Sequence, residues 1–433
     1  MQFVSRARLA ALVAAVFVTA WANGAQAATL KTLYSFCSLA NCTDGSNPGS
    51  ALLMDSSGNL YGTATSGGVN VSFGAAYELV KSGKGWKYRR IYSFCTVGVC
   101  SDGKDPTGGL IMDVAGDLYG TTRLGGSGNQ GIAFELIPNV KHTKWKLKTL
   151  YNFCTVGFCT DGANPQAGLS YAGAASGALY DGTSPLYGTA PSGGSDNGGV
   201  VFQLAPHGNK WRETVLHNLC GTTRCADGSE PIAPVTVDSH GNLFGTTVLN
   251  GVNGGGVVFE LSLQAKKWTE TVLHAFCATF QNNRCQDGNT PLNGALLIDG
   301  TGNLFGTTQN GGSQAGGTAF KLAPNGASSE LTTLYNFCSL ASCADGSAPQ
   351  GDLSMDSSGN LYGVANTGGA NGHGAIYRLN GTLAVLYSFC AQTNCTDGTN
   401  AQMGVIRDGS GDLLGTTIKG GADNEGSAFE LTP

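Results

Sequence analysis

Short apolar runs alternate with clusters of Gly, Asp and Pro along the chain, and this pattern repeats. One copy, over residues 86–136, reads WKYRRIYSFCTVGVCSDGKDPTGGLIMDVAGDLYGTTRLGGSGNQGIAFEL, and its breaks separate four short runs. Several runs alternate apolar and polar residues with period two, as in WKLKTLYNF at 145–153, which is typical of half-buried strands. Apolar stripes of helical period are missing. The pattern therefore predicts an all-β chain with four strands per copy.

We name the four strands a to d in the order GLIMD, LYGT, AFEL and WKLKTLYNF. Strands a and b are joined by a D-x-x-G-[ND]-L turn, in which Asp closes the turn through its side chain and Gly adopts positive φ. The Gly of strand b should allow a close approach of neighbouring backbone. Strand d opens with a tryptophan in four copies, which we expect to pack between neighbouring units, with a sugar-stacking platform as the alternative. The turn aspartates are Asp55, Asp113, Asp238, Asp299, Asp356 and Asp408.

A cysteine pair follows strand d in every copy, and these pairs account for all 14 cysteines. The spacing is C-x4-C except in the fifth pair, which is longer. An even count at such regular spacing predicts a disulfide within each copy, although pairing between neighbouring copies is an alternative. We expect no metal site, because thiolate sites need more than two cysteines and no histidine recurs beside them. The pairs are Cys37/Cys42, Cys95/Cys100, Cys154/Cys159, Cys220/Cys225, Cys277/Cys285, Cys338/Cys343 and Cys390/Cys395.

Four-stranded units at a period of roughly 60 residues are the signature of a β-propeller. Strands a, b and c can be counted seven times, which predicts a seven-bladed propeller with four antiparallel strands per blade. The chain starts in strand d, at residues 29–36, and stops in strand c. The N-terminal strand should therefore complete the last blade and close the ring, which removes exposed strand edges. An open β-solenoid is the rival architecture.

The first 27 residues read as a signal peptide, with Arg6 and Arg8 before an apolar run and AQA before Ala28. We expect the mature chain, 28–433, to be one propeller domain, monomeric, secreted or periplasmic, without a membrane span. The net charge of −5 becomes −7 once the two arginines are removed. Such a chain has no basic footprint for nucleic acid. Only 12% of residues are charged and 67 are Gly, as in turn-rich β proteins.

The d-to-a and b-to-c connections of a propeller emerge on one face, and here they carry the unusual sequence. The first holds the cysteine pair and then D-G-x-x-P; the second is a Gly-Gly loop. Seven disulfide-stiffened loops around the channel mouth would form a preorganised binding surface, or would only protect the protein from proteolysis. The seven D-G aspartates, Asp44, Asp102, Asp161, Asp227, Asp287, Asp345 and Asp397, form a regular acidic set. A turn role explains each without a ligand, and calcium at some of them is an alternative.

Candidate ligand-binding residues lie where the copies differ on this face. They are Arg123, Arg224, Phe280, Arg284, His373, Lys419, Asp423 and Glu425. No catalytic motif occurs in the context that it requires, and no cofactor is expected. Asp423 and Glu425 are the weak acid pair that a glycosidase or lyase would need. The third copy carries an insertion, SYAGAASGALYDGTSPLYG, which should lie on the opposite face.

The ordered combination LYSFC, D-G-x-x-P, D-x-x-G-N-L-Y-G-T, T-x-x-G-G and F-E-L, repeated along residues 28–433, closely resembles the GloVer-type tandem-repeat family of bacterial exported proteins. The D-x-x-G-N-L-Y-G-T core is also similar to the propeller repeats of two-component sensor ectodomains. Many GloVer-type proteins carry a C-terminal anchoring segment, whereas this sequence stops at Leu431-Thr432-Pro433, so a free exported protein is expected. The resemblance implies no established activity or catalytic residues.

These observations predict a non-enzymatic exported propeller that binds an extracellular polysaccharide or a protein partner through its disulfide-clipped face. A carbohydrate-active hydrolase or lyase and a structural envelope or matrix protein are the alternatives. A deep funnel that gathered Asp423, Glu425 or His373 with another acid would favour the enzyme.

Overall fold

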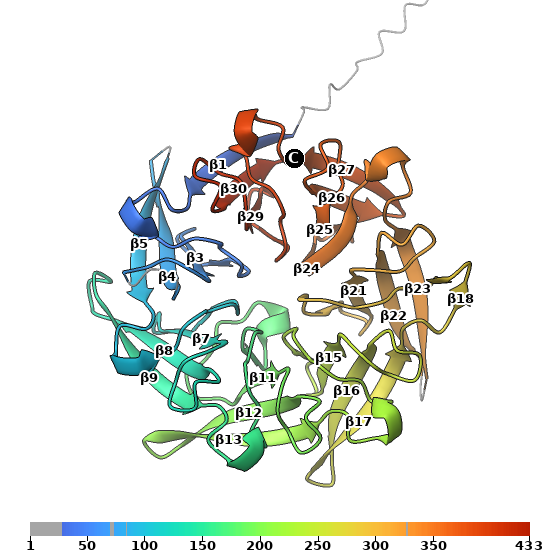
Figure 1. Ribbon diagram of the computed structural model, residues 1–433, viewed down its shortest axis with the longest axis horizontal. Coiled ribbons are helices and arrows are strands. Elements are labelled where there is room, and N and C mark those ends of the chain that lie inside the picture. Colours follow the sequence, from blue (N-terminus) through green and yellow to red (C-terminus); the bar gives the residue numbers. More distant parts are fainter. Residues whose placement is uncertain (1–27, 70–72, 84, 326–327) are drawn as a thin grey trace, which may run out of the picture.

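The computed structural model describes residues 28–69, 73–83, 85–325 and 328–433. These residues form seven four-stranded sheets arranged as the blades of a closed ring (Figure 1). The predicted signal peptide, 1–27, lies outside the described residues. Within the described part the structure contains strands and short 3₁₀ turns, and none of its helices is long and apolar enough to cross a membrane. The predicted seven-bladed propeller is confirmed.

In blades 1 to 6 strands a to d follow one another in sequence order from the channel outwards, whereas β1 supplies strand d of blade 7. The first four blades comprise β2 Leu53–Met54, β3 Leu60–Ala64, β4 Ala75–Ser82 and β5 Gly85–Ser93; β6 Ile111–Met112, β7 Leu118–Thr122, β8 Ile132–Pro138 and β9 Trp145–Asn152; β10 Ser170–Tyr171, β11 Leu186–Ala190, β12 Val200–His207 and β13 Lys210–Asn218; β14 Thr236–Val237, β15 Leu243–Thr247, β16 Val257–Gln264 and β17 Lys267–Ala275.

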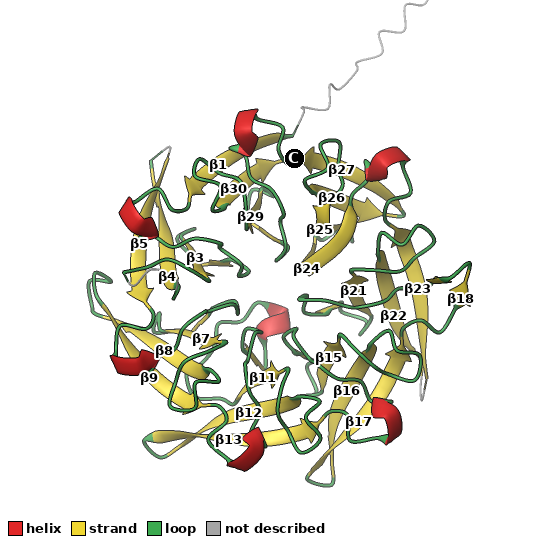
Figure 2. Ribbon diagram, in the orientation of Figure 1, coloured by secondary structure: helices red, strands yellow, loops and turns green. Residues whose placement is uncertain are grey.

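The last three blades comprise β20 Leu297–Ile298, β21 Leu304–Thr308, β22 Thr318–Asn325 and β23 Ser328–Asn336; β24 Ser347–Met355, β25 Leu361–Thr367, β26 Ala375–Asn380 and β27 Thr382–Ser388; β28 Val405–Arg407, β29 Leu413–Thr417, β30 Ser427–Thr432 and β1 Thr29–Ser35. A separate two-stranded hairpin, β18 Phe280–Gln281 and β19 Arg284–Cys285, projects from the ring. The 3₁₀ turns are η1 Ala40–Cys42, η2 Gly98–Cys100, η3 Gly157–Cys159, η4 Ala174–Ser176, η5 Thr223–Cys225, η6 Ala341–Cys343 and η7 Thr393–Cys395 (Figure 2).

The first strand of the chain closes the ring, as the sequence predicts. β1 pairs antiparallel with β30, from Thr29 opposite Thr432 to Ser35 opposite Ser427. Blade 7 thus consists of three C-terminal strands and one N-terminal strand, and β1 covers the edge that β30 would otherwise expose.

The a-to-b turns are built as the sequence predicts. Asp55 Oδ1 accepts the backbone N–H groups of Ser57 and Asn59, both at 2.8 Å. Gly58 follows with a φ of 79°, which disfavours a side chain. The turn aspartates are therefore structural.

The structure gives a different reason from the predicted one for the glycine of strand b. A Cβ on Gly120 would lie 2.8 Å from Cζ of Phe134, and one on Gly188 would lie 2.5 Å from Cζ of Phe202. Both rings come from strand c of the same blade. At these two positions the glycine makes room for a buried aromatic ring, and not for neighbouring backbone as expected.

The strand-d tryptophans pack between blades, as predicted. The ring of Trp211 in blade 3 lies 6.5 Å from that of Tyr119 in blade 2, and the ring of Trp268 in blade 4 lies 6.4 Å from that of Tyr187 in blade 3. Apolar clusters of this kind fill the spaces between adjacent sheets, so the core of the molecule is a ring of interfaces between blades.

Candidate functional site

The d-to-a and b-to-c loops lie on the same face, as predicted. Ser46, in the first d-to-a loop, forms an antiparallel bridge with Ser66 of the Gly-Gly loop, and the same bridge joins Lys104 to Leu124 and Thr399 to Lys419. Neighbouring blades are linked too, because the Asn47 N–H donates to the Glu425 carbonyl at 2.8 Å. The loops of this face therefore form a continuous hydrogen-bonded layer, which we call the clipped face.

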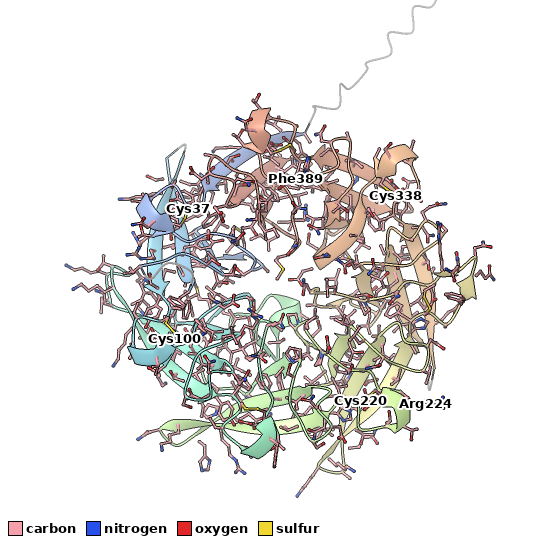
Figure 3. The ribbon with its side chains drawn as sticks, in the orientation of Figure 1. Cys37, Cys100, Cys220, Arg224, Cys338 and Phe389 are labelled. Atoms are coloured by element: carbon pink, nitrogen blue, oxygen red, sulfur yellow. A yellow bond between two sulfur atoms is a disulfide. The ribbon has the colours of Figure 1, made fainter. Side chains whose placement is uncertain are left out.

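All seven cysteine pairs form the predicted local disulfides. Their position corrects one expectation. Figure 3 shows Cys37, Cys100, Cys220 and Cys338 in the outer part of the ring, away from the central channel. Strand d is the outermost strand of each blade, so a clip that follows it directly must lie at the rim. The residues after D-G-x-x-P, and not the clips, reach the channel mouth.

The D-G aspartates are buried beneath the clips. Asp397 accepts the Tyr387 hydroxyl at 2.8 Å and the backbone N–H groups of Ala391 and Gln392 at 2.9 and 3.2 Å. Its exposed fraction is 0%. Equivalent bonds hold Asp44, Asp102, Asp161 and Asp345. These five aspartates fix the clips to strand d, and the hydrogen bonds of the turn account for them.

The central channel of the described residues holds a cavity of about 590 Å³. Its mouth is polar and lies on the clipped face, with Asn47, Thr107, Gln166 and Gln402 from the d-to-a loops. Residues in strand a or directly before it give an aliphatic wall, which includes Leu52, Leu110, Leu169, Leu296 and Leu353. An apolar cavity with a few polar groups at its entrance has the general character of a ligand site.

The insertion in the third copy borders the other end of the channel. It lies on the face opposite the clips, as predicted, because Tyr180 pairs with Asp113 and Val114 in an a-to-b turn of blade 2. Its 3₁₀ turn, η4, lies close to the centre of the ring (Figure 1). Ala174 and Ala175 of this turn contribute to the cavity wall. The insertion therefore shapes the cavity from the face opposite the clips.

Asp352 is the one ionisable residue among those that line the cavity. It stands between blades 5 and 7: its Oδ1 accepts the Ala295 N–H at 2.7 Å, and its backbone bridges to Gly404. Burial raises the pKa of Asp352 to about 6, although the Ala295 N–H opposes this rise. The carboxylate is therefore charged at neutral pH but weakly solvated, and it can accept hydrogen bonds from a cationic or N–H-bearing ligand.

Sequence reasoning missed Asp352. The equivalent positions in other copies hold a small residue, such as Ala51, Gly109, Gly168 and Gly404. The available signal was the aspartate of PQGDL, Asp352, which stands where these copies have glycine or alanine. Burial and the facing N–H of Ala295 appear only when the blades are placed around the channel.

The residues predicted from sequence differences do not meet at one site. Arg123 forms an ion pair with Asp105, with Nε 2.6 Å from Oδ2, and Lys419 pairs with Glu425 at 3.8 Å. Arg224 is exposed on the rim clip η5 (Figure 3), and Phe280 and Arg284 belong to the rim hairpin β18–β19. His373 and Asp423 are exposed on the Gly-Gly loops of blades 6 and 7. None of these eight residues lines the cavity.

Fold and site together define a disulfide-clipped seven-bladed β-propeller with a cavity at the hub of its clipped face. A family model described as the Gloeobacter/Verrucomicrobia repeat matches residues 18–185 and 275–433, more than half of the sequence. The chain belongs to this repeat family. Comparison with curated proteins gave no sequence match. Seven disulfides indicate an oxidising compartment, extracellular or periplasmic.

Solved structures with a similar arrangement are distant in sequence. A protein of unknown function from Dyadobacter fermentans has 10% identity and a TM-score of 0.44, over 93% of this chain and 98% of that one. A sialidase from Trypanosoma rangeli, in complex with the inhibitor DANA, has 10% identity and a TM-score of 0.43, over 93% and 59%. A glucose dehydrogenase has 12% identity and a TM-score of 0.43, over 81% and 99%. Likenesses this weak carry no argument about activity.

Proposed function

We propose that this propeller is a non-enzymatic, exported binding protein, and that it holds an extracellular ligand at the channel mouth of its clipped face. The observation that carries the proposal is the aliphatic cavity of about 590 Å³ in which Asp352 is the single ionisable lining residue. Such a cavity provides apolar contact area and one oriented charge, which suits recognition.

The cavity favours a protein partner over a polysaccharide. Sugar sites commonly stack the sugar ring on an aromatic side chain, and no aromatic residue is among those that line this cavity. The aliphatic wall and the Asp352 carboxylate instead suit a chain segment with an apolar stem and an amine, such as a lysine side chain or a free N-terminus. Amide side chains at the mouth, Asn47, Gln166 and Gln402, offer hydrogen bonds to a peptide backbone.

The rigidity of the mouth supports the same proposal. Each d-to-a loop is clipped by a disulfide at the rim and is hydrogen-bonded to the preceding blade near the channel, as between Asn400 N–H and the His373 carbonyl at 3.0 Å. A site that is ordered before the ligand arrives loses less entropy on binding.

The cavity lacks the paired groups that the enzymatic alternative needs. Hydrolysis of a glycosidic bond generally uses two carboxyl groups on opposite sides of the bond. Asp352 has no second acid or base beside it among the lining residues, and the predicted pair Asp423 and Glu425 lies outside the cavity. The arrangement supports binding better than catalysis.

The test uses residues 28–433 with their disulfides formed, applied to a peptide array and to a polysaccharide array. The peptides carry either lysine or norleucine, and either a free or an acetylated N-terminus. Release of reducing ends and of unsaturated sugars is measured in the polysaccharide wells. We expect retention on amine-bearing peptides, weakened at least about tenfold by Asp352→Asn, because a charge-assisted hydrogen bond contributes about 1.5–3 kcal/mol. Asp423→Asn, an exposed acid outside the cavity, should leave retention unchanged.

Binding should also weaken as the pH falls from 7 to 5, because Asp352 takes up a proton near its pKa of about 6. Retention on polysaccharide that is insensitive to Asp352→Asn would overturn the peptide assignment, and release of sugar would overturn the non-enzymatic one. Absence of retention on both arrays, without release of sugar, would favour a structural envelope role.

A further inference from the structure

A second group of polar side chains lies at the rim, and it departs from the pattern that the other blades share. In most copies the aromatic residue near the end of strand d donates directly to the D-G aspartate beneath the clip. Tyr34, Tyr92, Tyr151, Tyr335 and Tyr387 do so at 2.7–2.9 Å. Where histidine replaces tyrosine in blade 4, His274 Nε2 keeps the contact with Asp287, at 2.9 Å.

His217, the equivalent residue of blade 3, does not make this hydrogen bond. Its Nε2 lies 3.8 Å from Asp227 Oδ2 and 3.4 Å from Oε2 of Glu270, which comes from strand d of blade 4. One ligand atom from each of the three residues lies within 4.8 Å of the other two. The group therefore joins a clip to the outermost strands of two neighbouring blades, β13 of blade 3 and β17 of blade 4.

The position of Glu270 explains why such a group forms beside His217 and not beside His274. The equivalent strand-d position holds Leu147 in blade 2, Leu331 in blade 5 and Leu383 in blade 6. Beside the second histidine, His274, the next blade therefore offers Leu331 and no acid. Glu213 of blade 3 faces Asp161 and Tyr151 instead of a histidine. Within the part of the chain that the structure describes, these strand-d positions bring histidine and glutamate together only at the seam between blades 3 and 4.

Two atoms of the group are enclosed without a hydrogen-bond partner. They are His217 Nε2 and Glu270 Oε1. The side chains of Glu270 and Asp227 are 9% and 2% exposed. Leaving a buried carboxylate and an imidazole nitrogen unsatisfied costs free energy, so their convergence points to something that they both bind.

We propose that His217, Asp227 and Glu270 form a binding site for a divalent transition-metal ion such as Zn²⁺. Zinc takes imidazole and carboxylate ligands at about 2.0–2.2 Å, which places neighbouring ligands of a tetrahedral ion about 3.4 Å apart. The 3.4 Å and 3.8 Å separations of His217 Nε2 from the two carboxylates are close to this spacing.

The surroundings suit such a site. Asp227 is oriented by the Gly221 N–H at 3.0 Å and the Thr222 hydroxyl at 2.5 Å, which are the outer contacts that fix a metal-binding carboxylate. The His217 side chain as a whole is 23% exposed, so the site lies close to the surface although Nε2 itself is enclosed. The metal would join the outer strands of two blades. The sequence predicted no metal site, an expectation argued from the cysteine pairs, and this proposal departs from it: the cysteines are consumed in disulfides and take no part here.

The test measures Zn²⁺ binding to the disulfide-bonded protein by calorimetry. It measures Co²⁺ binding by the visible absorption that Co²⁺ shows when its ligands are arranged with low symmetry. The chain itself supplies the variants. His217→Tyr introduces the residue that five other copies use, and Glu270→Leu introduces the residue at Leu331, so both should fold. His274→Tyr is the matched control, because it removes a histidine beside an aspartate where no third ligand is present.

We expect one Zn²⁺ per chain, with affinity reduced at least about tenfold in His217→Tyr and Glu270→Leu and unchanged in His274→Tyr. We also expect Zn²⁺ to raise the unfolding temperature of the wild type and of His274→Tyr but not of the other two variants. Equal Zn²⁺ binding by wild type and His217→Tyr would overturn the proposal. So would the absence of binding for Zn²⁺, Co²⁺, Ni²⁺ and Cu²⁺, which would leave the group as a contact of the His217 imidazole with two carboxylates.

Discussion

Pro48, in the first D-G-x-x-P loop, packs against Gly426, in the last Gly-Gly loop, so closely that a Cβ on Gly426 would stand 2.5 Å from the proline Cδ. The same close approach recurs between Gly74 and Pro106 and, at 2.6 Å, between Gly317 and Pro349. The seam that joins the two ends of the chain is therefore built like the seams inside it.

Gly426→Ala should destabilise the protein by about 3 kcal/mol, because the methyl group would overpack Pro48 and the φ of 100° strains any side chain. Urea unfolding, followed by tryptophan fluorescence, measures the change. Gly409→Ala in the same blade is the control, since no atom lies within 4 Å of the position that its methyl group would occupy. Equal stability of the two variants would show that the seam tolerates the methyl group.

Asp397→Ala should lower the free energy of unfolding by about 3 kcal/mol. The change removes a buried carboxylate that accepts three hydrogen bonds and leaves the Tyr387 hydroxyl and two N–H groups without a partner. Asp423→Ala, at an exposed loop position, should change stability by no more than about 0.5 kcal/mol. A small effect at Asp397 would mean that water replaces the carboxylate beneath the clip.

Removing one disulfide should cost less than removing its aspartate. The double change Cys338→Ala with Cys343→Ala should lower stability by about 2 kcal/mol, the chain-entropy value for so short a loop. The clip should keep its conformation, because Asp345 still accepts the Ser339 and Leu340 N–H groups at 2.8 and 3.1 Å. Hydrogen exchange of these two amides measures local order, and loss of their protection would show that the disulfide positions the clip.

Glu213 should make stability depend on pH. Burial, assisted by the nearby Asp161, raises its pKa from 4.5 to about 8. The native state thus holds this proton more tightly than the unfolded state, so stability should fall as the pH rises from about 5 to 8.

Glu213→Leu introduces the residue that Leu147 provides at the equivalent position of blade 2. It should remove on the order of 2 kcal/mol of this loss of stability, a value that allows for solvent screening. Denaturant unfolding at pH 5, 7 and 9 measures it. The exposed Glu330→Gln is the control, and parallel pH profiles for wild type and Glu213→Leu would contradict the prediction.

The architecture was predictable because local signals agree with the global fold. The Asp55 turn, the positive φ of Gly58 and the phase of residues 29–36 each point to blades of four strands and to closure by the first strand. Repetition made these signals readable, since every copy confirms the others.

The sites were less predictable, because they depend on which blades face one another. Asp352 is a single substitution whose burial depends on the whole channel. Glu270 contacts His217 of the preceding blade and not His274 of its own strand, and this stagger between adjacent sheets is absent from the sequence. The clips were expected at the channel mouth because sequence gives the order of loop residues but not their distance from the axis.

The pairing of β1 with β30 links the first and the last strand of the described residues. Blade 7 cannot form until the ribosome has reached Thr432, and until then β1 presents an unpaired edge. A chain cut short by proteolysis or premature termination would keep that edge exposed, as a marker that proteases or chaperones can detect. Ring closure therefore makes the pairing of β1 sensitive to a break anywhere between Ser35 and Ser427, because β1 finds its partner only when the intervening blades are present.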